Sequence, residues 1–329
     1  MLQQNTITLE HIYEPVQSYL AKVEDRILDL LSTDNELSSE VIRYFFKSKG
    51  KLLRPALTLL GASFGMNDLA PVVSVAAAFE IFHSATLIHD DIIDCAYLRR
   101  NYPTVNTKWN SQIAVMIGDF LHDRAIKAFF NSKNERLMAS ALNMAGTVCD
   151  GEILEMKERH NFNLTEQGYF TIIERKTAML LATCLESGAI LAGFPDERVF
   201  ALKRYGMNFG KAFQIMDDCL DIIGNEHEFG KTLGADLEAG TLTLPVIRLV
   251  SLLDEKEKAR IYSKVKSGFA QPELGDFIRL LEAHGVIEYS IGKAKEFTEY
   301  ANLELSIFPD SPARQSLEEL LGYVIQRKR

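Results

Sequence analysis

Apolar residues recur at steps of three and four positions along most of this chain, which is the period of an amphipathic helix. The segment 9–31, LEHIYEPVQSYLAKVEDRILDLL, shows the pattern clearly. Prolines occur singly, mostly between such segments or in their first turns, where helices tolerate them. No run of alternating residues with an NG or DG turn indicates a β-hairpin. The periodicity predicts further helices at about residues 69–98, 108–131, 133–158, 164–192, 196–223, 241–267, 271–303 and 310–327.

The central segments are apolar on nearly every side, which is typical of helices in the middle of a bundle. We therefore predict an all-α fold. The length of 329 residues allows two or three domains or one large one. No low-complexity linker divides the chain, so we predict a single domain over residues 1–329. The glycine-rich segment 224–241 is irregular, and so long an irregular stretch in a compact domain is more often functional than idle.

The formal net charge of −9 argues against a nucleic-acid partner, which would require a basic surface. An anionic substrate is compatible with this charge only if cations or metal ions reverse the sign at the site. The four cysteines are far apart and form no CxxC, so their spacing suggests neither a zinc ribbon nor a disulfide framework. Together with the absence of a signal-peptide pattern in MLQQNTITLEHIYE, they predict a cytoplasmic protein with reduced thiols.

The longest apolar stretch, LAPVVSVAAAFEIFHSATLI, contains Pro71, Glu80 and His83. A membrane span would bury these groups in lipid at a large cost in free energy. We therefore predict a buried core helix and at most a peripheral contact with a membrane.

Two aspartate-rich pentads carry most of the functional signal. DDIID places Asp90 and Asp94 four residues apart on one helix face, with Asp91 beside them. The apolar residues that flank this pentad, and those that flank the second one described below, predict partly buried carboxylates. Such carboxylates repel one another unless a cation joins them. Carboxylate oxygens without His or Cys select hard cations such as Mg²⁺, which shares substrate phosphate oxygens. The second pentad, DDCLD, repeats the arrangement with Asp217, Asp218 and Asp221.

A single such pentad is as often a solvated acidic helix end as a metal site. Two pentads, each inside an apolar helix, favour two carboxylate walls that face each other across a cavity. An anion that bridges the metal ions would need basic side chains nearby. Each candidate could instead be an ordinary solvated side chain. The candidates are Lys51 and Arg54 on one helix face, Arg99 and Arg100 after the first pentad, Lys176 and Thr177 in an apolar segment, and Lys231 in the glycine-rich segment.

His83 lies seven residues before Asp90, two helical turns back on the same face. It is either a satisfied core histidine or a donor to a phosphate. With Glu80 it also spells E-x-x-H, the motif of di-iron helix bundles. Such a site needs a second E-x-x-H, and the sequence supplies none.

Together these residues resemble the trans-isoprenyl diphosphate synthase family. The resemblance is closest to medium- and long-chain members such as the catalytic component of heptaprenyl diphosphate synthases. It covers nearly the whole chain, and two aspartate-rich motifs with an upstream GKxxRP form a highly specific combination. The matching motifs are GKLLRP, HSATLIHDDIID, LRR, GDFL, DGEILEM, KTAML, FQIMDDCLD and GKTLGADLEAGTLTLP. The family fold implied is a bundle of long helices around a deep central cavity, usually dimeric.

The resemblance implies a role for each motif residue. Asp90, Asp91 and Asp94 would hold Mg²⁺ on an allylic diphosphate, together with Asp217, Asp218 and Asp221, and three ions are expected with diphosphate bound. Arg99, Lys176, Thr177, Gln214 and Lys231 would contact the allylic substrate, for which we expect farnesyl diphosphate. Lys51, Arg54, His83 and Arg100 would hold the diphosphate of isopentenyl diphosphate.

The chemistry implied is ionisation of the allylic C–O bond, attack by isopentenyl diphosphate and loss of a proton. Positive groups stabilise the leaving diphosphate without a protein nucleophile. The Thr177 hydroxyl and the Lys176 carbonyl would stabilise the carbocation, and the glycine-rich segment would act as a lid that excludes water.

Two positions depart from the family pattern. Asn101 in RRNYPT stands where many members have glycine, and Thr241 in GTLTLP where many have lysine. The second departure, with TVNTKW and the terminal QRKR, resembles the catalytic component of heptaprenyl diphosphate synthases. It leaves open a small non-catalytic partner subunit beside the expected homodimer.

The side chains before Asp90 bear on product length. Ala85, five residues upstream, is small where short-chain members commonly carry aromatic rings. We therefore expect a medium or long all-trans product, about C30–C40. Phe82 and Phe79, one and two turns deeper, would form the floor of the cavity or simply pack in the core.

Other functions remain as alternatives. A short-chain synthase (C15–C20) would use the same site. A class I terpene synthase is disfavoured by DDCLD and GKxxRP, and a non-catalytic subunit by the presence of all six aspartates.

Overall fold

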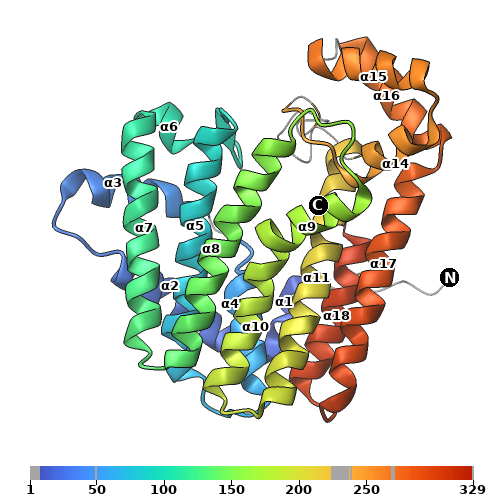
Figure 1. Ribbon diagram of the computed structural model, residues 1–329. Helices are drawn as coiled ribbons and strands as arrows, with labels where there is room; N and C mark the ends of the chain where they lie inside the picture. The colour runs from blue at the N-terminus through green and yellow to red at the C-terminus, as the bar shows by residue number, and fades with distance from the viewer. Residues whose placement is uncertain (1–7, 49, 224–236, 238, 268–270, 328–329) are drawn as a thin grey trace. The chain divides into compact units, whose positions relative to one another are not determined.

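The computed structural model describes residues 8–48, 50–223, 237, 239–267 and 271–327, without the side chains of 267 and 271–273 (Figure 1). Backbone contacts divide the chain into two compact units, and each is described by itself. Unit 1 comprises Met1–Met144, Thr183–Lys203 and Ile307–Leu320; unit 2 comprises Ala145–Ala182, Arg204–Ser306 and Leu321–Arg329. The prediction of a single domain over 1–329 stays a prediction.

The described residues are almost entirely helical, which confirms the all-α prediction. Unit 1 contains α1 (Leu9–Ile12), η1 (Glu14–Val16), α2 (Gln17–Leu30), α3 (Glu36–Phe46), α4 (Leu53–Ser63), η2 (Ala70–Val72), α5 (Val73–Ile93), β1 (Leu98–Arg99), β2 (Tyr102–Pro103), α6 (Val105–Lys108) and α7 (Ser111–Asn131). Unit 2 contains α9 (Glu166–Ile173), the π-helical turn η3 (Glu174–Ala178), α14 (Leu244–Leu252), α15 (Glu255–Ser267), α16 (Gln271–Ala283) and α17 (Val286–Glu304). Elements with residues in both units are α8 (Glu135–Glu158), α10 (Met179–Leu191), α11 (Asp196–Ile223), η4 (Leu305–Ile307) and α18 (Pro312–Gln326).

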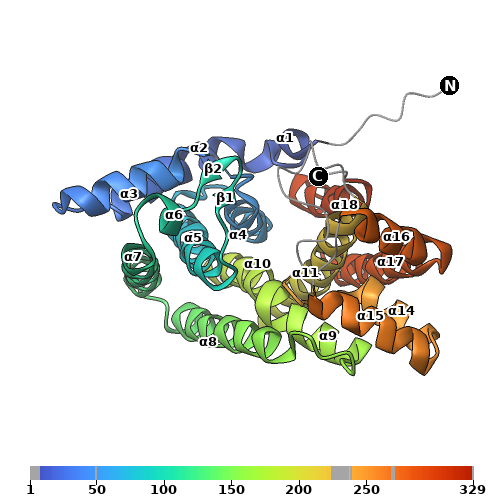
Figure 2. The same cartoon turned by 90° about the horizontal axis from the view of Figure 1, so that it is seen from above.

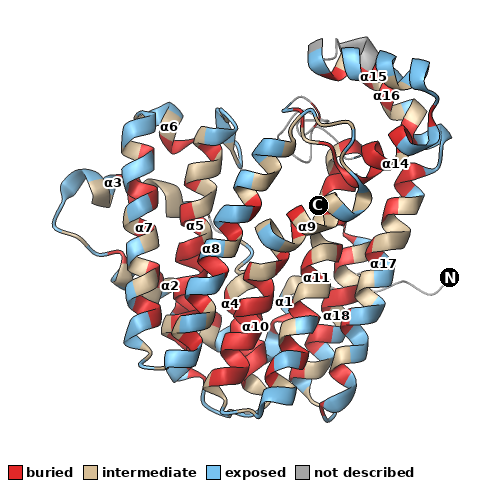
Figure 3. Ribbon diagram, viewed as in Figure 1, coloured by how far each residue is buried: buried red, intermediate tan, exposed pale blue. Residues whose placement is uncertain are grey.

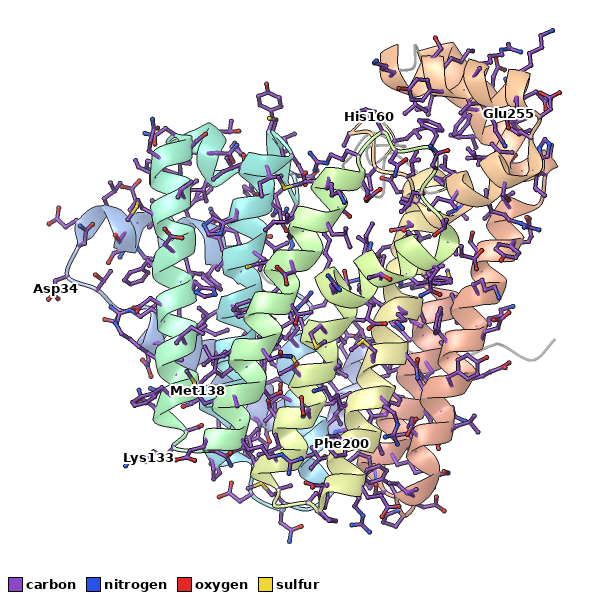
Figure 4. All side chains as sticks on the ribbon, viewed as in Figure 1. Asp34, Lys133, Met138, His160, Phe200 and Glu255 are labelled. Atoms are coloured by element: carbon purple, nitrogen blue, oxygen red, sulfur yellow. The ribbon has the colours of Figure 1, made fainter. Side chains whose placement is uncertain are left out.

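Helix α5 forms the core of unit 1, where it packs against α7, α2 and α4 (Figures 1 and 2). Its side chains are buried on nearly every side, as Figure 3 shows, and Phe79 and Ile81 are fully buried. The segment Ala70–Ile93 is long and apolar enough to cross a membrane, but 67% of the relevant window is buried within the protein. This agrees with the prediction of a core helix.

A close backbone approach joins α10 to α4 within unit 1. A Cβ atom placed on Gly188 would lie 2.2 Å from the carbonyl oxygen of Thr58 and 2.7 Å from the backbone nitrogen of Ala62. No side chain fits at that distance, so glycine lets the two backbones meet. In unit 2, α11 meets η3 in the same manner, because a Cβ on Gly210 would lie 2.5 Å from the Cα of Ala178.

The periodicity located most helices but not all of their ends. The segment 196–223 is a single helix as predicted. The segment 9–31 is interrupted at η1, because Pro15 falls there, and 241–267 is divided between α14 and α15. The helix predicted over 69–98 ends at Ile93, and a short hairpin follows that the sequence did not predict. Helix α3 was also missed.

Candidate active site

The first aspartate motif lies at the carboxyl end of α5. Asp91 is buried, with 2% of its surface exposed, whereas Asp90 is half-buried and Asp94 is exposed. Asp94 lies just outside the helix as its C-cap, and its N–H donates to the carbonyl oxygen of Asp90 at 2.8 Å. The predicted one-turn spacing of Asp90 and Asp94 is therefore present, although Asp94 is not itself helical.

Asp91 is held by Arg99 in a two-pronged ion pair. Nε of Arg99 donates to both carboxylate oxygens at 3.0 Å, and Nη2 donates to Oδ1 at 2.8 Å. A planar guanidinium matched to a buried carboxylate in this way is a strong charge-assisted interaction. Arg99 therefore compensates the buried charge of Asp91, and a cation that approaches Asp91 has to share it with Arg99.

The hairpin β1–β2 presents Arg99 and Arg100. Its two-residue turn, Arg100–Asn101, has φ values of 51° and 65°, as a type I′ turn requires. The hydroxyl of Tyr44 donates to the carbonyl oxygen of Pro103 at 2.8 Å and fixes the outgoing strand. The departure from the family pattern at Asn101 thus falls where glycine is favoured and asparagine is the next best choice.

Cationic side chains gather in a pocket of unit 1 between α3, α5 and the hairpin. The pocket has an empty volume of about 680 Å³, and its walls include Ser48, Gly50, Glu80, Arg99 and Arg100. Nη1 of Arg100 donates to the carbonyl oxygen of Ser48 at 2.9 Å. An anion that entered this pocket would meet the guanidinium groups of Arg99 and Arg100 and the side chain of Lys47.

His83 and Arg54 belong to the same cluster of charges. Burial lowers the pKa of His83 well below its ordinary value, and the nearby charges of Arg54, Arg99 and Arg100 lower it further. His83 is therefore neutral near pH 7. Burial also lowers the pKa of the Arg100 guanidinium, an effect that Arg99 increases and Glu80 opposes.

Lys51 and Arg54 do not share a helical face, so that expectation is wrong. Helix α4 begins only at Leu53, and its N-cap residue Leu52 has a positive φ of 50°. Arg54 lies in the first turn of α4 and is half-buried, whereas Lys51 precedes the helix and is exposed.

The second aspartate motif lies near the carboxyl end of α11, in unit 2. Asp218 is 4% exposed and accepts hydrogen bonds from the hydroxyl of Tyr169 at 2.6 Å and from Nε2 of Gln214 at 2.8 Å. Gln214 in turn accepts from the hydroxyl of Thr177 at 2.7 Å. The chain of contacts joins three predicted site residues, Thr177, Gln214 and Asp218, and adds Tyr169, which the sequence did not single out.

Asp217 pairs with an arginine from the end of the chain. Nη2 of Arg327 lies 2.7 Å from Oδ1 of Asp217 and donates to the carbonyl oxygen of Phe213 at 2.7 Å. The guanidinium also stacks on the ring of Phe213, 4.0 Å from its centroid. Arg327 was not among the predicted site residues, although it lies in the terminal QRKR. Asp221, one turn after Asp217, lines a second and mostly apolar pocket of about 290 Å³.

Lys176 lies in the π-helical turn η3, between two carboxylates of α8. Its Nζ is 2.6 Å from Oε2 of Glu155 and 3.0 Å from Oε2 of Glu152. Single π-helical turns are rare and are frequent at functional sites. Both glutamates belong to the DGEILEM motif, so the structure joins that motif to KTAML. Lys231 lies outside the described residues.

The donor chemistry of the two motifs fits a hard divalent cation. Among the described residues no three His, Cys, Asp or Glu side chains already form a metal-binding group. Mg²⁺ does not require one, because it keeps waters and takes oxygen ligands from substrate phosphate as well as from one or two carboxylates. Asp90 and Asp94 in unit 1 and Asp217 and Asp221 in unit 2 retain exposed surface for such a role.

The candidate length determinants lie in the core of unit 1. Ala85 and Phe82 are each 1% exposed, and Phe79 is fully buried. The ring of Phe82 lies 5.1 Å from that of His122, and the ring of Phe79 lies 4.8 Å from that of Phe129. These contacts agree with the packing role of both phenylalanines and leave their effect on product length a prediction.

The helical fold, two aspartate-rich helix segments and a cationic pocket define the class of helical isoprenyl diphosphate synthases. The solved polyprenyl synthase from Caulobacter crescentus, in complex with calcium and isoprenyl diphosphate, superimposes with a TM-score of 0.94 at 28% identity, over 99% of this chain and 100% of that one. The fold class predicted from the sequence is therefore confirmed.

The sequence comparisons identify the family. The model of the Polyprenyl synthetase family matches residues 35–278. Heptaprenyl diphosphate synthase component 2 of Geobacillus stearothermophilus is 34% identical over 97% of this chain and 99% of its own. The short chain isoprenyl diphosphate synthase of Methanothermobacter thermautotrophicus is 31% identical over 92% and 99%. The chain belongs to the polyprenyl synthetase family, and it is a prenyltransferase that elongates trans-prenyl diphosphates.

Proposed function

We propose that this enzyme condenses isopentenyl diphosphate repeatedly with farnesyl diphosphate and releases an all-trans product of about C30–C40. The observation that carries the product length is the small side chain of Ala85, five residues before Asp90, where a large ring would restrict a growing prenyl tail. The similarity to a heptaprenyl synthase component supports the same range.

A short-chain product is the second candidate. It is favoured by the similarity to the short chain synthase of Methanothermobacter thermautotrophicus and by the buried ring of Phe82, one turn below Ala85. A class I terpene synthase is disfavoured, because the chain belongs to a family of elongating enzymes.

In the proposed reaction the residues of unit 1 bind the diphosphate of isopentenyl diphosphate through Lys51, Arg54, His83 and Arg100. The allylic diphosphate is held by Arg99, Lys176, Thr177, Gln214 and Lys231. The hydrogen bond from Thr177 to Gln214 fixes the hydroxyl that, with the Lys176 carbonyl, faces the developing carbocation. The carboxylate that anchors this pair is Asp218, itself fixed by Tyr169.

We propose that both aspartate motifs bind Mg²⁺ with the allylic diphosphate, with three ions in the full complex. When bound, the ions supply positive charge that stabilises the departing diphosphate. The metal and ligand named for the Caulobacter crescentus structure, calcium and isoprenyl diphosphate, support this assignment.

We further propose a cytoplasmic homodimer. The described part of the chain carries exposed apolar side chains on α7, where Met116 is 65% and Phe130 is 70% exposed, and a second copy would bury them. All four cysteines are free, as expected in a reducing compartment. A small non-catalytic subunit is a further proposed partner, because the Geobacillus stearothermophilus relative is one component of its enzyme.

The test is to incubate the purified protein with labelled isopentenyl diphosphate, farnesyl diphosphate and Mg²⁺, and to separate the products by length. The reaction is run alone and with candidate small subunits. Products of about C30–C40 support the proposal. Termination at C15–C20 contradicts it, and a requirement for a second chain assigns the small subunit.

A further inference from the structure

Glu80 is a buried acid for which the proposed reaction has no use. It lies on α5 one turn before His83 and is 8% exposed. Its Oε2 atom has no hydrogen-bond partner among the described residues. A buried carboxylate oxygen in this state costs free energy unless something else compensates the charge. Its persistence in the wall of the cationic pocket therefore requires a reason.

The surroundings of Glu80 are built from cations. A Cβ atom on Gly50 would lie 3.3 Å from Oε1 of Glu80 and 3.4 Å from Nη2 of Arg100, so both side chains border the same glycine. Arg54 on α4 and Arg100 in the hairpin turn attract the ionised carboxylate. The charge of Glu80 also acts on the buried thiol of Cys184 on α10, whose pKa burial raises to about 12. His83, one turn further along α5, is influenced by Arg54, Arg99 and Arg100.

Two opposing influences meet at this carboxylate. Burial raises the pKa of Glu80, and the charges of Arg54 and Arg100 offset only part of that effect. Burial thus favours the protonated form of Glu80, whereas the two arginines favour its carboxylate form. They are also the residues proposed to hold the diphosphate of isopentenyl diphosphate, so the two anions compete for the same guanidinium groups.

We propose that Glu80 is a proton-accepting positioning residue of the diphosphate pocket. As a carboxylate it attracts Arg54 and Arg100 in the free enzyme, and it takes one proton from solvent when a diphosphate binds to those arginines. Protonation removes the like charge beside the ligand and provides an O–H donor. This inference rests on the proposed isopentenyl diphosphate site, and it assigns a role to the E-x-x-H motif.

The pH dependence has a definite sign. A group that gains a proton on binding has a higher pKa in the complex than in the free protein. The contribution of Glu80 to binding is then strongest at low pH, and it weakens by up to about tenfold per pH unit as pH rises between the two pKa values. Glu80→Gln, which is neutral at every pH, should lack this contribution and keep only the pH dependence that comes from the ligand itself.

The experiment is isothermal titration calorimetry with isopentenyl diphosphate alone, in buffers of different ionisation enthalpy, across the pH range in which the protein is folded. The ligand also titrates, so the quantity of interest is the difference between wild type and Glu80→Gln. We expect the wild type to take up more protons on binding than Glu80→Gln does. At its maximum, the difference should approach about one proton per ligand. At high pH, Glu80→Gln should bind isopentenyl diphosphate at least as tightly as the wild type does.

Glu186→Gln is the matched control. Glu186 is another buried acid of unit 1, 5% exposed, but it is paired with Lys203 at 3.0 Å and lies outside the pocket. This variant should keep the proton uptake of the wild type. A second measurement needs no variant: infrared difference spectra of the wild type should gain a protonated-carboxyl band when the ligand is added.

The outcomes separate the two proposals. If the wild type does not bind isopentenyl diphosphate, the assignment of the pocket is wrong. If the wild type binds it but proton uptake equals that of Glu80→Gln and no carboxyl band appears, the role of Glu80 is wrong. A uniform loss of affinity in Glu80→Gln with unchanged proton uptake would indicate a purely structural residue and would also overturn the inference.

Discussion

Asn101 shows how a single position shapes the hairpin that presents Arg99 and Arg100. With Arg100 it forms the turn between β1 and β2, and its φ of 65° is left-handed. A left-handed conformation costs an ordinary L-residue about 1–2 kcal/mol, and a β-branched residue suffers most. The orientation of Arg99 and Arg100 thus depends on a turn residue that tolerates positive φ.

We expect Asn101→Gly to match or exceed the wild type in stability and Asn101→Val to lose about 1–2 kcal/mol. Urea unfolding followed by circular dichroism measures both. The valine variant should also bind diphosphate less tightly, because the turn that presents Arg100 is strained. Equal stability of the glycine and valine variants would show that the turn does not constrain this residue.

Ala85 provides the second residue-scale prediction. Its side chain is 1% exposed. In the proposed reaction, a phenylalanine in its place would put a ring five residues before Asp90, in the path of the growing prenyl tail. Ala85→Phe should therefore shorten the product, and Ala85→Ser, which adds a single oxygen, should leave it unchanged. Thin-layer chromatography of the products measures the length. An unchanged ladder of products in a folded Ala85→Phe enzyme would exclude this position as a determinant.

At the scale of elements, the crossing of α4 and α10 depends on the absence of a side chain at Gly188. A Cβ atom there would lie 2.2 Å from a backbone oxygen, and backbone atoms cannot move aside as a flexible side chain can. Gly188→Ala should cost about 1–3 kcal/mol or more, in the range of an overpacked core.

Gly146 on α8 is the control for this prediction, because a Cβ atom there would meet nothing within 4 Å. Alanine is the better helix former, so Gly146→Ala should be neutral or stabilise the protein by up to about 1 kcal/mol. Thermal unfolding of both variants checks the pair. A fall in stability of similar size in both variants would mean that the close approach of Gly188 to the backbone of α4 is not what decides the outcome.

Arg327 tests a contact between the ends of α18 and α11. Removing its guanidinium leaves Asp217 without this ion pair and the carbonyl of Phe213 without its donor. Arg327→Gln should destabilise the protein by about 1–3 kcal/mol. Arg279→Gln, which breaks an exposed pair with Asp276, should change stability by less than about 0.5 kcal/mol. Chemical denaturation compares the two, and equal effects would contradict a special role for Arg327.

The elements also show what could be predicted from the sequence. Long apolar periodicity identified α11 and the core helix α5, because burial on one or all sides leaves a direct trace in the residue pattern. The hairpin left none, since Leu98 and Tyr102 are 52% and 46% exposed and each strand has only two residues. Tyr169 and Arg327 were missed because their partners lie 49 and 114 residues away, a separation that no local pattern encodes.

At the scale of the whole molecule, the proposed metal site makes a prediction about how Mg²⁺ and diphosphate bind together. The chain carries a formal charge of −9, and the two aspartate motifs concentrate six acids. Diphosphate without a cation is repelled by them, and a cation without diphosphate lacks half of its oxygen ligands. We therefore expect Mg²⁺ and diphosphate to stabilise the protein far more together than the sum of their separate effects.

Thermal unfolding with each ligand alone and with both measures this coupling without any turnover. When Mg²⁺ and diphosphate are present together at a hundred times their dissociation constant, the free energy of unfolding should rise by about 2.7 kcal/mol. Chelation of the metal should remove this increase. If both motifs bind the same metal–diphosphate group, Asp90→Asn and Asp217→Asn should each abolish the extra stabilisation, that is, the part by which Mg²⁺ and diphosphate together exceed the sum of their separate effects. Asp123→Asn, whose acid pairs with Lys127 on the surface of α7, should retain it. Loss of the excess in only one of the two motif variants would mean that the motifs act independently, and the proposed joint site would have to be abandoned.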